Sequence, residues 1–333
     1  MKFMIAGLGS IGRRHLRNLL ALGQDDILLY RTFQSTLPDD ELSGFPVETD
    51  LQAALAHKPD AVIVANPTSR HLDVAIPAAH AGCHLLLEKP VSHSLEGVIA
   101  LKAAVERTGV HVLVGYQFRF HPGLQQIMRR LGEGAIGQPL SVHAHWGEYL
   151  PAWHPWEDYH SGYSARADLG GGVILTLSHP LDYLRWLIGE VQSLWAFTGS
   201  QGGLGLDVED TAEIGLRFQN GVLGSLHLDY NQRPPEHRLE IIGNQGTLCW
   251  DNADGNVGLF RAVSTGGWEC LPIPENFERN LLFLEEMRHF LAVISGEATP
   301  TCSLEDGIRA LQLALSAVLS AQSKKMIDIN SEW

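Results

Sequence analysis

Residues 2–12 read KFMIAGLGSIG. A short apolar run leads directly into three glycines with G-x-G-x-x-G spacing, and an amphipathic stretch follows them. In a turn between a first strand and a first helix, Gly7 permits the tight turn, Gly9 lets a pyrophosphate approach the backbone, and Gly12 lets helix and strand pack closely. The helix N-terminus adds N–H donors and a positive dipole end. We therefore expect a dinucleotide to be bound by Gly7, Gly9, Ser10, Ile11 and Gly12; the alternative is a glycine-rich turn without a ligand.

The rest of the first third of the chain repeats this alternation of short apolar runs and amphipathic stretches, which is typical of βαβ units around a parallel sheet. The predicted strands are residues 2–6, 27–30, 61–65, 84–87 and 111–115, with helices beginning near Ile11, Leu51, Ser69 and Ser94. The fold class is therefore α/β, with an N-terminal Rossmann domain over residues 1–121.

Beyond Arg119 the pattern changes to longer alternating runs, which predict a second α/β domain over residues 122–333 with a mainly antiparallel, open sheet. Its expected strands are residues 140–146, 193–198, 211–218, 222–230 and 238–242, with a hairpin turn at Asn220–Gly221. Its expected helices are residues 172–188, 276–294 and 304–322, the last packing back on the first domain.

The composition excludes several classes of protein. The 333 residues carry a formal charge of −14, so a general basic surface for nucleic acid is not expected. Four scattered cysteines favour a reducing compartment, and no apolar run approaches the roughly 18 residues that a membrane span needs. Because the first strand is expected to begin at Lys2, no signal peptide is predicted, and the expected location is the cytoplasm.

The end of the second predicted strand bears on the choice of cofactor. Sites for NAD usually carry an acid there that accepts hydrogen bonds from the ribose hydroxyls, whereas this chain has Arg31 and Thr32. An arginine pairs with a 2′-phosphate instead, so NADP is favoured and NAD remains possible. The alternative is that Arg31 is a solvated loop charge.

Four motifs in this order carry a family resemblance: the glycine turn, Ala65-Asn66-Pro67-Thr68-Ser69-Arg70-His71, Glu88-Lys89-Pro90, and Gly170-Gly171-Gly172 followed by His179-Pro180-Leu181-Asp182. Over nearly its whole length the chain resembles the glucose–fructose oxidoreductase/inositol dehydrogenase/MocA family. The resemblance implies an NAD(P)-dependent enzyme that moves a hydride to or from a sugar, sugar acid or sugar derivative. It also implies that Asn66, Pro67, His71, Glu88 and Lys89 border the cofactor.

The resemblance assigns the chemistry to Lys89 and His179. In the family the lysine contacts the reacting hydroxyl or carbonyl oxygen, where a cation stabilises developing negative charge, and the histidine exchanges a proton with that oxygen. The alternatives are a surface lysine before a turn proline and a buried structural histidine. Many relatives carry an aspartate where this chain has Thr176, which cannot act as an acid. Either Lys89 and His179 suffice with water or an acid such as Asp182, or catalysis is altered or lost.

Aromatic and polar side chains are dense just before the glycine run, as in sites that stack on sugar rings and bind their hydroxyls. The candidate substrate-binding residues are Arg119, Trp153, Trp156, Tyr159, Tyr163, Arg166 and Asp182. The alternatives are an interface loop for the aromatic residues and structural ion pairs for the arginines. His143 and His145 share a strand face, but no HExxH or CxxC spacing accompanies them, so no metal is expected.

Three functions remain open at this stage: a sugar oxidoreductase, an imine or non-sugar carbonyl reductase, and a cofactor-binding regulator without turnover. A homodimer or homotetramer is expected because an open sheet covered by helices on one side leaves an apolar face to be buried.

Overall fold

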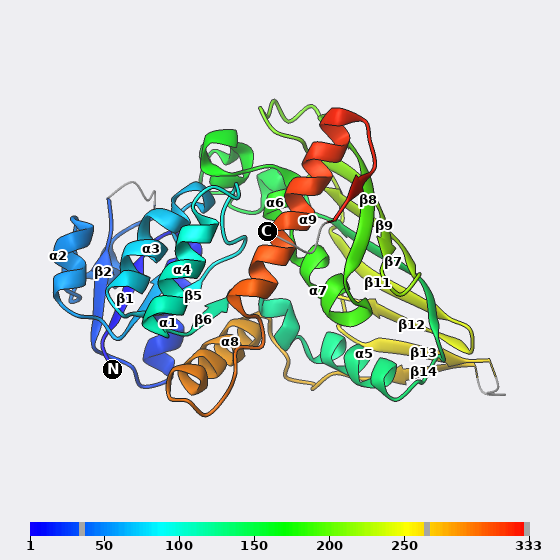
Figure 1. Ribbon diagram of the computed structural model, residues 1–333, viewed down its shortest axis with the longest axis horizontal. Helices are drawn as coiled ribbons and strands as arrows, with labels where there is room; N and C mark the ends of the chain where they lie inside the picture. Colours follow the sequence, from blue (N-terminus) through cyan, green and yellow to red (C-terminus); the bar gives the residue numbers. More distant parts are fainter. Residues whose placement is uncertain (33–36, 263–266, 330–333) are drawn as a thin grey trace. The chain divides into compact units, whose positions relative to one another are not determined.

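The computed structural model describes residues 1–32, 37–262 and 267–329 (Figure 1). These residues form two compact units, each built around its own sheet. The first unit contains residues 1–117, 168–170 and 279–311, and the second contains residues 118–167, 171–278 and the end of the chain. Among the described helices, none combines the length and apolar composition that a bilayer crossing requires.

The first unit has a six-stranded parallel sheet in the order β3-β2-β1-β4-β5-β6, which is the Rossmann order. Its strands are β1 Phe3–Ala6, β2 Ile27–Tyr30, β3 Val47–Glu48, β4 Ala61–Val64, β5 His84–Leu87 and β6 Val112–Val114. Its helices are α1 Ser10–Ala21, α2 Leu51–Ala56, α3 His71–His80, α4 Val98–Thr108, α8 Arg279–Ile294 and the first part of α9 Leu304–Ser323. The predicted Rossmann fold is confirmed: β1 and β4 are continuous apolar runs because they are buried on both faces.

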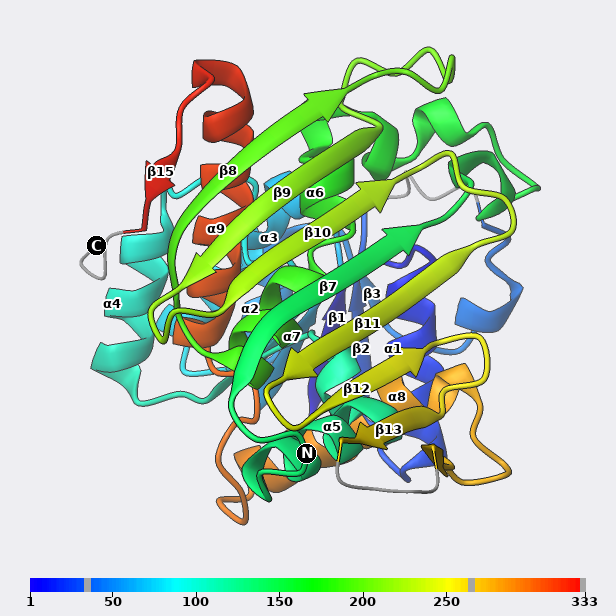
Figure 2. The same ribbon diagram turned by 90° about the vertical axis from the view of Figure 1, so that its right-hand side faces the viewer.

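The second unit has a nine-stranded sheet in the order β14-β13-β12-β11-β7-β10-β9-β8-β15. Its strands are β7 Pro139–Gly147, β8 Val191–Gly199, β9 Thr211–Phe218, β10 Leu223–Asp229, β11 Glu236–Gly243, β12 Gly246–Asp251, β13 Val257–Arg261, β14 Trp268–Leu271 and β15 Ile327–Asp328. Its helices include α5 Pro122–Gly132, α6 Val173–Thr176 and α7 His179–Ile188. Among the described strands of this nine-stranded sheet only β7 and β10 pair in parallel, so the mainly antiparallel prediction is confirmed. Figure 2 shows this sheet face-on with α5, α6 and α7 behind it.

Three predicted helices are wrong in their bounds, and the simplest case is the helix expected over residues 276–294, which begins at Arg279. The helix expected over residues 172–188 is two helices, because Pro180 has no N–H to continue a helical ladder and fits only the first turn of a new helix, α7. The helix expected from Ser94 begins at Val98, after Gly97 in the left-handed conformation. The prediction did not include β3 or the strands β12–β14. Their alternation of apolar and polar residues is short, or it continues into the turns between the strands.

We call the side of the nine-stranded sheet that faces away from α5, α6 and α7 the open face. It is not the apolar surface that the sequence suggested. Polar side chains such as His143, Glu213, Arg238 and Glu240 occupy its middle strands. The large exposed apolar side chains of this unit's strands lie toward its margins and strand ends: Leu140, Trp195, Phe197, Leu223 and Trp268.

Candidate active site

The glycine turn has the geometry that the sequence predicted. Gly7 has a φ of 95°, and a Cβ atom on it would come within 2.5 Å of the Asn66 nitrogen. A Cβ on Gly12 would come within 1.8 Å of the Gly7 carbonyl oxygen, whereas one on Gly9 would meet no atom within 4 Å. Gly9 also ends the loop without a side chain that could cap α1. The turn therefore packs tightly on its inner side and leaves open space at the helix N-terminus, which fits a pyrophosphate.

The end of β2 carries a cluster of charges. Arg31 is buried and donates to Asp39 Oδ1 at 2.9 Å, and Arg13 from α1 reaches the same oxygen at 3.5 Å. The hydrogen bond from Arg31 holds the pKa of the exposed Asp39 carboxyl below its usual range. Arg31 is therefore not the solvated loop charge of the alternative interpretation, and two guanidinium groups converge on one anionic position. Thr32 is exposed beside them.

The loop after β4 is fixed by His71. Its Nδ1 lies 2.9 Å from the carbonyl oxygen of Pro90, and its Nε2 lies 3.0 Å from that of Asn66. Burial lowers the pKa of His71 in spite of the nearby Glu88 charge. His71 therefore ties the β4 loop to the segment after Lys89, while Pro67 is exposed on that loop.

Glu88, at the end of β5, points to a partner that the sequence analysis missed. Its Oε1 accepts from His15 Nε2 at 2.7 Å, and the His15 ring is fully buried on α1. Burial alone would raise the pKa of Glu88, but the hydrogen bond and charge of His15, with the charge of Lys89, hold it below the usual value. The pair links α1, which carries the glycine turn, to the strand end that carries the half-buried Lys89. His15 lies three residues after Gly12, and that spacing on the buried face of α1 was its only sequence signal.

A second carboxyl lies beside this pair. Glu286 on α8 is fully buried, and neither of its oxygens has a hydrogen-bond partner among the described residues. One of its oxygens lies within 4.8 Å of ligand atoms of His15 and Glu88. Burial, followed by repulsion from Glu88, raises the pKa of Glu286 well above its usual value and so favours its neutral form.

His179 begins α7 in the second unit and is buried. Its ring lies edge-on to Phe118 with a centroid distance of 5.0 Å and tilted against Trp146 at 5.6 Å. Thr176 is also buried, at the end of α6, and interacts with the Tyr230 hydroxyl. His179 thus has a fixed ring position, and Thr176 makes a structural contact in this unit.

Arg119 and Asp182 were both candidate substrate ligands, and they bind each other. Arg119 Nε donates to Asp182 Oδ2 at 2.9 Å and Nη2 donates to Oδ1 at 2.6 Å, with both side chains almost fully buried. This bidentate pair favours the structural alternative for both residues.

The aromatic segment divides into anchors and exposed side chains. Trp153 packs edge-on against Tyr230 at 5.7 Å, and the Tyr159 hydroxyl donates to the Leu204 carbonyl at 3.0 Å. These two residues hold the segment in place. In contrast, Trp156, Tyr163 and Arg166 are exposed and remain candidates for binding a substrate.

Glu209 is a further ionisable residue that the sequence analysis missed. Its Oε1 accepts the Ile174 N–H at 3.2 Å, and a Cβ on Gly172 would come within 2.5 Å of the same oxygen. Burial raises its pKa. Glu209 therefore holds the first turn of α6. Gly172 leaves space for the Glu209 carboxylate because it has no side chain.

Comparisons with known proteins agree with this geometry. The family model of the oxidoreductase family with an NAD-binding Rossmann fold matches residues 1–116, and that of the GFO/IDH/MocA C-terminal domain matches residues 124–249. The chain is 30% identical to an uncharacterised oxidoreductase of Synechocystis sp., covering 80% of this chain and 77% of that protein. It is 28% identical to myo-inositol 2-dehydrogenase of Thermotoga maritima, covering 99% and 98%. A levoglucosan dehydrogenase solved with NADH and levoglucosan superposes with a TM-score of 0.86 at 21% identity, covering 99% and 100%. The chain therefore belongs to the glucose–fructose oxidoreductase/inositol dehydrogenase/MocA family of NAD-binding oxidoreductases.

Proposed function

We propose that this protein transfers a hydride between a nicotinamide cofactor and a hydroxyl-bearing or carbonyl carbon of a sugar, sugar acid or sugar derivative. The observation that carries the proposal is the pairing of His15 with Glu88, which joins the glycine turn on α1 to the strand end that presents Lys89. Relatives whose names include inositol and levoglucosan dehydrogenases support a polyhydroxylated substrate.

In this proposal the bound nicotinamide supplies or accepts the hydride, and the chain supplies the rest. The N-terminus of α1 binds the pyrophosphate between Gly9 and Gly12. The Lys89 ammonium contacts the substrate oxygen and stabilises the negative charge that develops on it. His179 exchanges a proton with the substrate oxygen, and the aromatic packing around its ring fixes its direction. Trp156, Tyr163 and Arg166 contact the substrate.

We further propose that NADP is preferred over NAD, because Arg13 and Arg31 converge on one oxygen of the exposed Asp39. The two guanidinium groups would bind a 2′-phosphate, which is the stronger anion, in place of that carboxylate.

We also propose a cytoplasmic homodimer or homotetramer, in which the exposed apolar side chains Trp195 and Phe197 on β8 contribute to the contact. Light scattering tests the assembly. A particle of one 36.6 kDa chain at micromolar concentration would contradict it.

A fluorescence screen of NADPH and NADH against sugars, polyols, sugar acids and nucleotide sugars, read in both directions, tests the activity. Turnover of one of these supports the proposal. A protein that binds NADPH and turns over none of them would favour the regulatory alternative, which Thr176 leaves open.

A further inference from the structure

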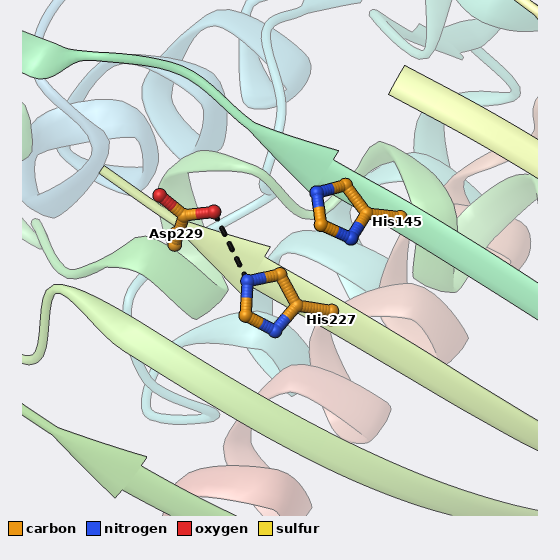
Figure 3. A group of neighbouring side chains, drawn as sticks. All are labelled: His145, His227 and Asp229. Carbon is orange, nitrogen blue, oxygen red and sulfur yellow. Dashed lines mark hydrogen bonds and ion pairs between the residues drawn. The ribbon is translucent and has the colours of Figure 1, made fainter. Parts of the chain in front are cut away.

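Two histidines and an aspartate that have no assigned part in hydride transfer lie together on the open face of the nine-stranded sheet (Figure 3). His145 on β7 and His227 on β10 are direct neighbours in the parallel register, and their rings stack with centroids 4.6 Å apart. Asp229 ends β10 two residues later, on the same face, and its Oδ2 lies 3.0 Å from His227 Nε2. The chain thus brings three potential metal ligands from two strands to one point.

The backbone leaves room for this arrangement. Gly147 is the register partner of Asp229, and a Cβ atom on it would come within 2.2 Å of Asp229 Oδ2. The other carboxylate oxygen, Oδ1, accepts the N–H groups of Asn231 and Gln232, each at 2.6 Å. The strand end therefore fixes the carboxylate by one oxygen and directs the other toward the histidines.

Each histidine also has an outer partner of the kind that orients metal ligands. Glu213 on β9 lies 2.6 Å from His227 Nδ1, and its carboxylate favours a proton on this nitrogen, so that Nε2 can coordinate an ion. Gln232 Oε1 lies 2.7 Å from His145 Nε2, and the Gln232 amide donates to Glu236 at 3.0 Å. A hydrogen-bonded carboxylate behind a ligating histidine is a recurrent feature of zinc sites.

We propose that His145, His227 and Asp229 bind a divalent transition-metal ion of the zinc class. The three ligand atoms lie within 4.8 Å of one another, and tetrahedral coordination with bonds of about 2.0 Å requires roughly 3.3 Å between ligand atoms. Small side-chain rotations therefore suffice. His145 and His227 line a hollow of about 680 Å³ on the open face, from which the ion and a fourth ligand can enter. This site is independent of the proposed hydride transfer.

The competing state is a protonated His227 shared between two carboxylates. The hydrogen bonds that His227 donates to Asp229 and Glu213 outweigh its partial burial and raise the pKa of His227. Arg238 on β11 is the register partner of His145 and is a further charged neighbour of the group. Its charge is balanced by Glu236 and Asp251. A bound ion must displace this proton.

Titration of the full-length, tag-free, metal-depleted protein with Co²⁺ tests the proposal, with the visible absorption spectrum and equilibrium dialysis as readouts and Zn²⁺ as competitor. We expect one Co²⁺ per chain with the spectrum of a tetrahedral site containing nitrogen and oxygen ligands, displaced by Zn²⁺. His227→Gln and Asp229→Asn should abolish this binding. Glu213→Gln should weaken it about 10- to 100-fold, as is usual when the partner behind a ligating histidine is lost.

The controls are His143→Gln and Glu286→Gln. His143 lies on the same strand face but hydrogen-bonds Ser225, and Glu286 belongs to the separate buried group with His15. Both variants should bind Co²⁺ as the wild type does, and circular dichroism of each metal-free variant should show native folding. Wild-type protein that binds no Co²⁺, binding that survives His227→Gln, or metal uptake only with growth of the particle mass would overturn the assignment.

Discussion

Arg119 and Asp182 form a bidentate ion pair that is almost fully buried, with N–O distances of 2.9 and 2.6 Å. Asp182→Asn removes the carboxylate charge from this buried pair, so the free energy of unfolding should fall by about 3–5 kcal/mol. Urea denaturation measures this change. The matched control is Asp251→Asn, which breaks the exposed pair with Arg238 and should cost at most about 1 kcal/mol. Equal losses in the two variants would contradict the structural role of the buried pair.

Cofactor choice should depend on the charge cluster at the end of β2. Arg31→Asp should weaken NADPH binding about 10- to 100-fold, because hydrogen bonds to charged groups contribute roughly 1.5–3 kcal/mol, and should change NADH binding little. Asp39→Asn should strengthen NADPH binding, because it removes the carboxylate charge that pairs with Arg31 and competes with the phosphate. Tryptophan quenching titrations measure both affinities, with Arg107→Asp on the exposed side of α4 as the charge-matched control. If Arg31→Asp keeps its NADPH affinity, this cluster does not bind the 2′-phosphate.

Glu286 should make the protein less stable as the pH rises. Its pKa is raised in the folded state, so folding takes up a proton above the ordinary carboxyl pKa. The free energy of unfolding is therefore highest below that ordinary pKa. It declines as the pH rises toward the raised pKa of the folded state. Glu286→Gln keeps the neutral form, so its Tm should exceed that of the wild type at neutral pH and match it more closely near pH 4.

Thermal unfolding across this pH range is the measurement, and Glu285→Gln is the control, because Glu285 is half-exposed and pairs with Arg288. A Glu286→Gln protein with an unchanged or lower Tm at neutral pH would show that the buried carboxyl is not a source of pH-dependent instability.

The features that the sequence predicted well are local ones. The glycine turn needs only the six residues from Gly7 to Gly12, and the parallel strands are marked by continuous apolar runs. The pairs His15–Glu88 and Arg119–Asp182 join residues 73 and 63 positions apart, and no local pattern indicates which side chains meet. For the same reason the sequence paired His145 with His143 on its own strand. In the structure the neighbour of His145 is His227, which lies on another strand.

The helix break between Thr176 and His179 was within reach of sequence reasoning. Pro180 fits the first turn of a helix and cannot lie in the middle of an unbroken one, yet the apolar spacing on both sides favoured a single helix. The burial of Thr176 against Tyr230 could not be predicted in this way, because Tyr230 follows β10 and reaches α6 only in the folded sheet unit.

The most direct test of the account compares Lys89→Met with the wild type on the substrate found by the screen, measuring kcat and the NADPH dissociation constant. Methionine keeps the side-chain length and removes the charge, and Lys102→Met, on the exposed side of α4, is the matched control. Loss of a charge partner of the reacting oxygen should lower kcat about 10²- to 10³-fold, with NADPH affinity within about twofold of the wild type. Wild-type turnover by Lys89→Met, or a loss of NADPH affinity in step with kcat, would contradict the role assigned to Lys89.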